Sequence, residues 1–314
     1  MLLVVAGCGR GPITPPSPAA GVCVARGQWM DPATGRPLAH PEVLARAARA
    51  RIVLLGERHD VVEDHRWQLD VLAGLAAWRA TLVVGLEAFA RAAQPALDAW
   101  VAGDLSVDEL LTATRWRETW SVAPELYLPL LHFTRRHRVP TVALNVDRSL
   151  VQRVGQRGWH AIPAAERGGI GDPAPPRPAY RERLLATYAE HVCKPPERVR
   201  DTAGFARFVE AQLLWDRAMA EALGRAASAH PQALVVGLAG SGHLEHGDGI
   251  PHQLDALGID DVAVLLPWHV SHDCSTPPPG IADAVFGLGP LAAEAPPPVR
   301  HRCEPGGAAA HPPR

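Results

Sequence analysis

Several residue types and patterns are scarce in this chain, and their scarcity argues against particular kinds of surface, metal site and membrane span. Lys194 is the only lysine among 314 residues, so arginine carries nearly all of the positive charge, which we read as compositional bias. The formal net charge is −2, and no basic run is dense enough to indicate a nucleic-acid surface. No two of the five cysteines are spaced as Cys-x-x-Cys, which argues against a cysteine zinc site. Beyond the N-terminus, no apolar segment is long enough to span a bilayer.

The N-terminus indicates export. Residues 1–8 form a short apolar stretch that ends in Val-Ala-Gly-Cys, which is typical of a bacterial lipoprotein cleavage box with Cys8 as the lipidated residue. A tether rich in Pro, Ser and Gly follows at 9–21. The stretch is very short and no Lys or Arg precedes it, so a chance apolar start is the alternative. We expect 1–26 to be signal and tether, which would anchor the protein through Cys8 in the bacterial cell envelope.

Lipid anchoring at Cys8 would leave four further cysteines in an oxidising compartment. They are Cys23, Cys193, Cys274 and Cys303. Four thiols allow three pairings, and the sequence does not choose among these pairings or free thiols.

The rest of the chain is apolar enough for a sizeable core, with 47% hydrophobic and 20% charged residues. Short aliphatic runs predict strands at 52–55, 82–86, 141–144, 233–238, 262–266 and 284–287. Helical patterns lie between them, and capping-box sequences occur at Asp60–Glu63 and Ser106–Glu109. This alternation favours a parallel sheet with right-handed crossovers. We therefore predict an α/β fold with a mostly parallel sheet flanked by helices.

The alternation breaks after residue 150. The region 155–178 is rich in Gly and Pro, and helical patterns follow it. We predict that 151–227 is a small, mostly helical subdomain inserted into an α/β core made of 27–150 and 228–290. Residues 291–314 are rich in Pro, Ala and Gly, and we expect them to form a disordered tail.

Two glycine-bearing tetrads, each ending in histidine, are the most informative feature. Gly-Glu-Arg-His at 56–59 and Gly-Ser-Gly-His at 240–243 both follow short apolar runs. Glycine past a buried strand indicates a tight turn, and in a parallel sheet such turns collect at one edge, where ligands of open α/β folds bind. We therefore expect His59 and His243 to line a common pocket. Imidazole is a frequent metal ligand and also a general base.

Acidic residues accompany the first histidine. Glu57 lies in its tetrad, and Glu87 ends the predicted strand 82–86, where a carboxylate is costly to bury without a partner. Glu87 could be a ligand, an acid or base, the orienting partner of a histidine, or simply a capping group for the next helix. Because His59 precedes a helix start, we expect a neutral imidazole, the form that a metal or haem iron needs. We expect His65 to lie on the surface.

Three other positions leave alternatives open. Arg148 follows the strand at 141–144 and could bind a ligand carboxylate, pair with Glu87 or belong to a structural turn. Asp216 and Gln212 lie on an otherwise apolar helix face, where they could reach the site; we favour a hydrogen-bonded pair that locks the insertion. His246 is three residues past His243 and could face the same cavity if a helical turn forms.

The order of these segments resembles the ChaN-type haem-binding lipoprotein family of the Tiki/erythromycin-esterase superfamily. The likeness covers roughly 27 to 288, and its pieces are Gly56–Asp60, Gln68, Gly85–Phe89, Trp120, Tyr127, Ala143–Asn145, Ala211–Gln212, Trp215–Asp216, Met219–Ala220, Gly242–His243 and Gly249–Pro251. It implies an α/β core with a small helical subdomain, an outer-membrane lipid anchor and haem or iron handling. Tyrosine is expected where this chain has His246. This imidazole would replace a phenolate at the haem iron with an altered redox potential, or haem binding would be lost.

Two functional hypotheses follow, together with a third in which the site is vestigial. In the first, an exported lipoprotein binds haem for haem or iron acquisition, and the contacts are His59, His243, His246 and Arg148. In the second, a metal-dependent hydrolase holds Zn, Mn or Fe with the set that the superfamily resemblance implies, and Glu57 or Glu87 is the general base. That set is His59, His243, Glu57 and Glu87. Expected partners are haem or a small molecule, the membrane, and possible second copies that sandwich haem in a homodimer; we expect no nucleic acid.

Overall fold

The structure is a computed structural model that describes residues 23–270 and 276–291, so Cys8 and nearly all of the expected tail lie outside the described residues. Within them, eight strands form one sheet in the order β2-β1-β8-β7-β3-β6-β4-β5. Its parallel part consists of β3 (Ile52–Glu57), β4 (Leu82–Ala90), β5 (Thr141–Asn145), β6 (Leu234–Gly240), β7 (Val262–His269) and β8 (Ala284–Leu288). Two short antiparallel strands, β1 (Trp29–Met30) and β2 (Pro37–Leu38), continue it beyond β8. This confirms the predicted α/β fold with a mostly parallel sheet.

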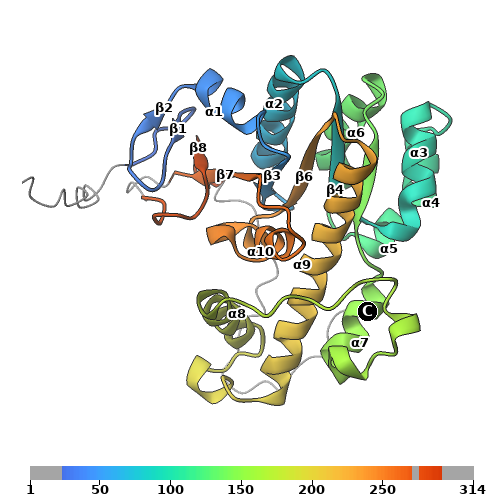
Figure 1. The fold of residues 1–314 in the computed structure, drawn as a ribbon, viewed down its shortest axis with the longest axis vertical. Helices are drawn as coiled ribbons and strands as arrows, with labels where there is room; N and C mark the ends of the chain where they lie inside the picture. Colours follow the sequence, from blue (N-terminus) through green and yellow to red (C-terminus); the bar gives the residue numbers. More distant parts are fainter. Residues whose placement is uncertain (1–22, 271–275, 292–314) are drawn as a thin grey trace, which may run out of the picture.

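Helices cover both faces of the sheet (Figure 1). The side chains of β3 alternate between them, because successive residues of a strand point to opposite faces. Val53 and Leu55 pack with the helices of one face, whereas Ile52 and Leu54 pack with those of the other. The first face carries α1 (His40–Ala47), α2 (Val62–Trp78), α3 (Gln94–Ala102), α4 (Val107–Ala113), α5 (Trp116–Thr119) and α6 (Pro124–Arg136). The second face carries α10 (Ile250–Asp255) and half of α9 (Ala203–Ala229).

The long helix α9 belongs to two layers. Its C-terminal half packs on the sheet through residues such as Met219 and Leu223. Its N-terminal half packs against α7 (Arg148–Arg157) and α8 (Pro178–His191), which gather at the lower end of the molecule in Figure 1. The 3₁₀ turns of the described chain are η1 (Arg91–Ala93), η2 (Trp159–Ala161), η3 (Ala164–Glu166), η4 (Pro196–Arg198), η5 (Ser241–His243) and η6 (Glu245–Gly247). The middle of α9 therefore passes the carboxyl edge of the sheet.

Of three local predictions, one was wrong, one gave a strand that is present but longer than expected, and one was confirmed. The predicted capping box at Asp60 does not form: α2 begins at Val62 without a side-chain cap, and Asp64 instead accepts a hydrogen bond from the Arg58 N–H at 2.7 Å. The predicted strand at 82–86 continues through Glu87 to Ala90, with an irregularity in its pairing to β5 after Leu86. The capping box at Ser106 and Glu109 is present at the start of α4.

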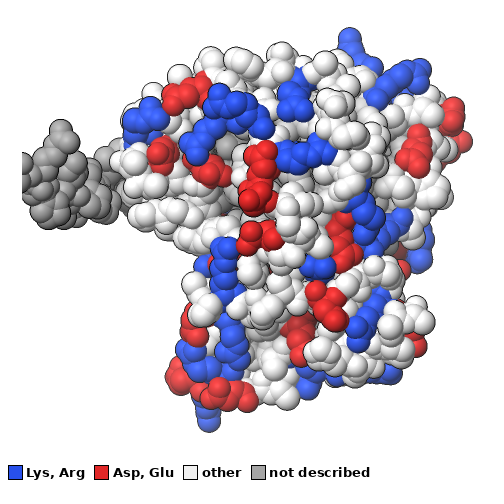
Figure 2. Space-filling view, viewed as in Figure 1, with Lys and Arg blue, Asp and Glu red and all other residues white. Residues whose placement is uncertain are grey.

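The face of the molecule drawn in Figure 2 carries charges of both signs, with acidic and basic side chains interspersed. None of the helices in residues 23–270 and 276–291 is long and apolar enough to cross a membrane.

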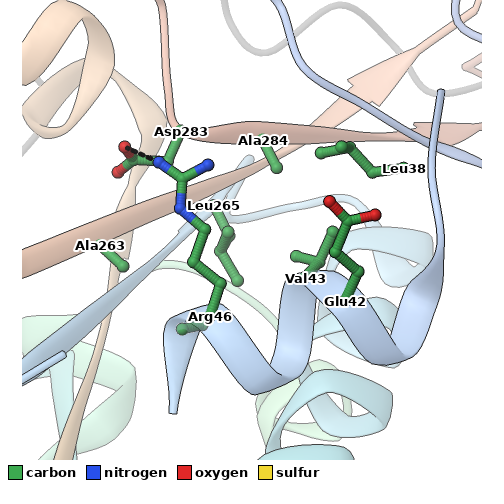
Figure 3. A pocket seen from close by; sticks show the side chains of 9 residues that line it. Leu38, Glu42, Val43, Arg46, Ala263, Leu265, Asp283 and Ala284 are labelled. Atoms are coloured by element: carbon green, nitrogen blue, oxygen red, sulfur yellow. Dashed lines mark ion pairs between the residues drawn. The ribbon is translucent and has the colours of Figure 1, made fainter. Parts of the chain in front are cut away.

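A small pocket lies between α1 and the strands β7 and β8, where Arg46 approaches Asp283 at 3.7 Å (Figure 3). Its volume of about 30 Å³ holds only one or two waters.

A side chain takes the place of a neighbouring strand at the β5 edge. The Gln94 amide donates to the Thr141 carbonyl oxygen at 2.8 Å and accepts from the Ala143 N–H at 2.9 Å. It thereby pairs two groups that an edge strand would otherwise present to other chains.

We expect Gln94→Ala to lower the free energy of unfolding by about 1–2 kcal/mol, because it leaves both backbone groups without this partner. Urea unfolding measures the change. Gln94→Glu keeps the acceptor but loses the donor, so its free energy of unfolding should lie between those of the parent protein and Gln94→Ala. A Gln94→Ala midpoint equal to that of the parent protein would show that water satisfies this edge equally well.

Candidate functional site

Glu57, at the end of β3, is the centre of a buried hydrogen-bond cluster. Its Oε1 lies 2.7 Å from His59 Nδ1 and also accepts from the Tyr127 hydroxyl, and its Oε2 accepts from Gln68 Nε2 at 2.8 Å. A carboxylate only accepts, so Nδ1 of His59 carries a proton. Glu57 is buried, whereas the His59 side chain is 35% exposed. We call Tyr127, Glu57 and His59 the Glu57 triad.

A second cluster, again made of a tyrosine, a carboxylate and a histidine, forms from distant parts of the chain. Asp216, fully buried on α9, lies 2.6 Å from His243 Nδ1 and accepts from the Tyr180 hydroxyl at 2.9 Å. We call Tyr180, Asp216 and His243 the Asp216 triad. Two of the three tyrosines in the chain thus each donate to a different buried carboxylate, and each carboxylate also bonds to a histidine.

Glu87 lies between the two triads. Its Oε2 accepts from the Gly240 N–H at 2.7 Å, and its Oε1 lies 3.8 Å from His243 Nε2. A Cβ at Gly240 would lie 3.1 Å from His59 Nε2 and 3.6 Å from Glu87 Oε2, so both side chains pack closely against this glycine. The register explains the meeting, because Gly240 of β6 lies beside Glu57 of β3, and β6 also pairs with β4. Both imidazoles of the tetrads therefore flank one carboxylate at the carboxyl edge of the sheet.

The neighbouring carboxylates raise the pKa values of both imidazoles. Burial lowers the pKa of His59, but the hydrogen bond to Glu57 and the charge of Glu87 outweigh it, so its pKa is raised. Burial likewise opposes the charge on His243, yet Asp216 and Glu87 raise its pKa to about 9. The pKa of Asp216 is raised too, because burial outweighs its contact with His243. For His59 the direction of this shift is opposite to that expected from a helix N-terminus, because Glu57 and Glu87 favour the charged imidazole.

Two further expectations were wrong. His65 is buried at 2% exposure instead of lying on the surface; its Nε2 lies 2.9 Å from the His59 carbonyl oxygen, and its ring is 4.4 Å from that of Tyr127. The first turn of α2 packs under the Glu57 triad, which explains this burial. Asp216 bonds to His243 instead of locking the insertion with Gln212, which is only partly buried.

An open cavity of about 420 Å³ adjoins the site over the ends of β4 and β5. Trp120 and Trp215 form part of its wall, and their rings lie 4.7 Å from His59 and 6.1 Å from His243. Arg148, the first residue of α7, is exposed on the same wall. Among the ion pairs of residues 23–270 and 276–291, none joins Arg148 to Glu87.

His246 does not share the His243 environment. The segment forms two 3₁₀ turns instead of an α-helical turn, and His246 itself has φ 61°. Its backbone N–H donates to the Ile281 carbonyl oxygen at 2.8 Å. Within the described residues, no hydrogen bond or ion pair joins its ring to the triads. The structure therefore brings together His59, His243, Glu57 and Glu87, and it leaves His246 apart on the following turn.

The four residues predicted as metal ligands are engaged with one another and with neighbouring donors. In the part of the chain that the structure describes, no group of three or more His, Cys, Asp or Glu residues could hold a metal ion. Metal binding also requires deprotonated imidazoles, which the raised pKa values of both histidines oppose. The arrangement supports proton transfer and anion contacts better than coordination of a bare metal ion.

Comparison with solved structures finds similar chains at low sequence identity, and the first of them shares the fold. ChaN of Campylobacter jejuni, solved with cofacially bound haem, is 20% identical, with a TM-score of 0.65 over 82% of this chain and 95% of that one. An erythromycin esterase mutant in its open conformation is 14% identical, with a TM-score of 0.47 over 77% of each chain. The type III effector HopBA1 is 13% identical, with a TM-score of 0.42 over 87% of this chain and all of its own. No curated protein matches the chain.

Family assignment rests on a match to a family model over about two thirds of the chain. The model of a family described as haem-binding uptake, Tiki superfamily, ChaN matches residues 43–254. That span contains Glu57, Glu87, Asp216 and both histidine tetrads, and it makes up most of the chain. The chain therefore belongs to the ChaN family of haem-binding uptake proteins in the Tiki superfamily.

Proposed function

We propose that this protein binds haem as cargo and acts in haem or iron acquisition as an exported lipoprotein. The observation that carries the proposal is the family match over 43–254, which includes both tetrads. The site lies at the carboxyl edge of a parallel sheet, where open α/β folds bind ligands. Haem would bring its own iron, and the protein's part is to bind, orient and release it.

The three histidines differ in their fitness to hold iron, which needs a free ring nitrogen. His243 is bonded to Asp216, faces Glu87 with its other nitrogen and has a pKa of about 9. His59 donates its Nδ1–H to Glu57 and, within the described residues, has no hydrogen bond at Nε2, but Glu57 and Glu87 raise its pKa, which favours a proton on that nitrogen. His246 is partly exposed, and within the described residues no hydrogen bond occupies its ring. His246 is therefore our proposed axial ligand, and its imidazole stands where the family resemblance expects tyrosine.

The cavity beside the two triads offers contacts of the kind that a porphyrin needs. The indoles of Trp120 and Trp215 present flat apolar surfaces, and the exposed guanidinium of Arg148 can pair with a carboxylate. We keep Arg148 as the proposed partner of a haem propionate, with His59 and His243 as proton-bearing groups beside the site.

Export and assembly form the finer part of the proposal. Cys23 and Cys193 each take part in a disulfide, and disulfides persist mainly in oxidising compartments, which supports a place in the cell envelope with an anchor at Cys8. Cofacial haem in the Campylobacter jejuni protein suggests that two copies of this chain sandwich haem. Metal-dependent hydrolysis has less support, because the described residues form no metal cluster.

Titration with hemin tests the proposed ligand. We expect the parent protein to shift the Soret band, and we expect His246→Ala to weaken hemin binding at least tenfold because the iron loses its protein ligand. His160→Ala, at an exposed histidine on η2, is the matched control and should bind as the parent does. A parent protein without a Soret shift would overturn haem binding. Identical curves for the His246 and His160 variants would overturn the assignment of the ligand.

A further inference from the structure

One face of α8 contacts both histidine-bearing segments. Arg177, Tyr180 and Arg183 are spaced by three residues, so they lie along one side of the helix and its N-cap. Tyr180 donates to Asp216 and so reaches His243. The two arginines reach the turn that carries His246 through contacts separate from the hydrogen bonds of the triads, and Arg183 also lies 5.6 Å over the Tyr180 ring.

Asp248 is the point at which these arginines meet the turn. It is 3% exposed and forms a short ion pair with Arg183, and its other oxygen lies 3.6 Å from Arg177. The guanidinium groups also donate to backbone carbonyl oxygens of the turn, Arg183 to Glu245 at 3.3 Å and Arg177 to Gly247 at 3.2 Å. A buried carboxylate with two cationic partners fixes the backbone on both sides of His246.

The turn needs such support because its backbone conformation is unusual. His246 has φ 61°, and the flanking Gly247 and Gly249 have φ values of 67° and 60°. Left-handed conformations at non-glycine residues persist where the surroundings hold them. A Cβ at Gly249 would lie 2.3 Å from the His243 carbonyl oxygen, so the turn is also closely packed against the preceding tetrad.

We propose that Arg183, acting through Asp248, is a positioning residue for His246, so that α8 sets the direction in which this imidazole is presented. The inference rests on the proposed function, in which His246 holds the haem iron. Tyr180 of the same helix face fixes His243 at the same time, and α8 therefore couples the two halves of the 240–249 segment.

Arg183→Ala should weaken hemin binding about tenfold, in the range seen when groups supporting a metal ligand are removed. The spectrum of its hemin complex should shift toward that of His246→Ala, and added imidazole should restore it. Arg183→Lys keeps the ion pair and should stay within about threefold of the parent. Arg181→Ala is the matched control, because it removes the same charge from the same helix, where its guanidinium packs 4.7 Å over the Phe205 ring.

Hydrogen exchange of the haem-free protein gives a readout that does not depend on haem. Amides of 244–249 should exchange faster in Arg183→Ala than in Arg181→Ala, while the sheet strands exchange alike. Equal exchange and equal hemin affinity in the two variants would overturn the positioning role. A parent protein that fails to bind hemin would overturn the proposed function instead, and the exchange data would still decide whether Arg183 holds the turn.

Discussion

Asp216→Ala should destabilise this protein severely, lowering the free energy of unfolding by about 3–5 kcal/mol. Asp216 is fully buried and bonds to both His243 and Tyr180. Its removal leaves a protonated imidazole and a phenol hydroxyl in the interior without their acceptor. Breaking one partner of a buried ionic cluster costs far more than the net value of the cluster, because the remaining charge has lost its compensation.

Urea unfolding of the oxidised protein measures this loss, and two variants sharpen the interpretation. Asp255→Ala removes an exposed carboxylate from α10 and should change the stability by no more than about 0.5 kcal/mol. Asp216→Asn preserves the shape and can still accept from Tyr180, so its loss of stability should lie between those of Asp255→Ala and Asp216→Ala. A loss below about 1 kcal/mol in Asp216→Ala would mean that water replaces the carboxylate and that the Asp216 triad is not sealed.

Stability should also fall as the pH rises from about 6.5 to 9. The pKa of His243 is about 9 in the folded protein, whereas its ordinary value is 6.5, because Asp216 and Glu87 outweigh burial. A raised pKa means that the folded protein holds this proton more tightly, so the contribution is complete below pH 6.5 and is lost as the pH approaches 9. The full loss is on the order of 3 kcal/mol. His59 acts in the same direction, since its pKa is raised as well.

Urea midpoints across this pH window and an NMR titration of the His243 ring test the prediction together. Asp216→Asn removes the main charge that favours the imidazolium, so it should flatten the stability profile and move the His243 pKa toward 6.5. A parent profile that stays level from pH 6.5 to 9, or a slope that survives in Asp216→Asn, would contradict the assignment to His243.

Local patterns predicted the parallel part of the sheet and the site residues that lie at its strand ends. Aliphatic runs marked the parallel strands, and the two tetrads placed His59 and His243 at the same edge because strand ends align in a parallel sheet. Glu57 and Glu87 followed from their places at or near those ends. These predictions needed only the strand period and the direction of the chain.

The rest of the site depends on how helices cross the edge, which local patterns do not contain. Asp216 was visible as a polar residue on an apolar helix face, but only the docking of α9 shows that it meets His243. Tyr180 gave no comparable signal, because a tyrosine near the start of a helix is usually a packing residue. His65 was placed on the surface because its own helix does not reveal that α6 brings Tyr127 over it.

The order of the strands has a consequence for how the chain matures. β3 and β4 are made early, yet they do not pair with each other, since β6 fills the space between them. Until residues 234–240 insert, both early strands keep a free hydrogen-bonding edge, and Glu57 and Glu87 have no shared neighbour. The first half of the polypeptide is thus exposed to mispairing until late synthesis, and pairing is safest when it waits until residues 234–240 are available.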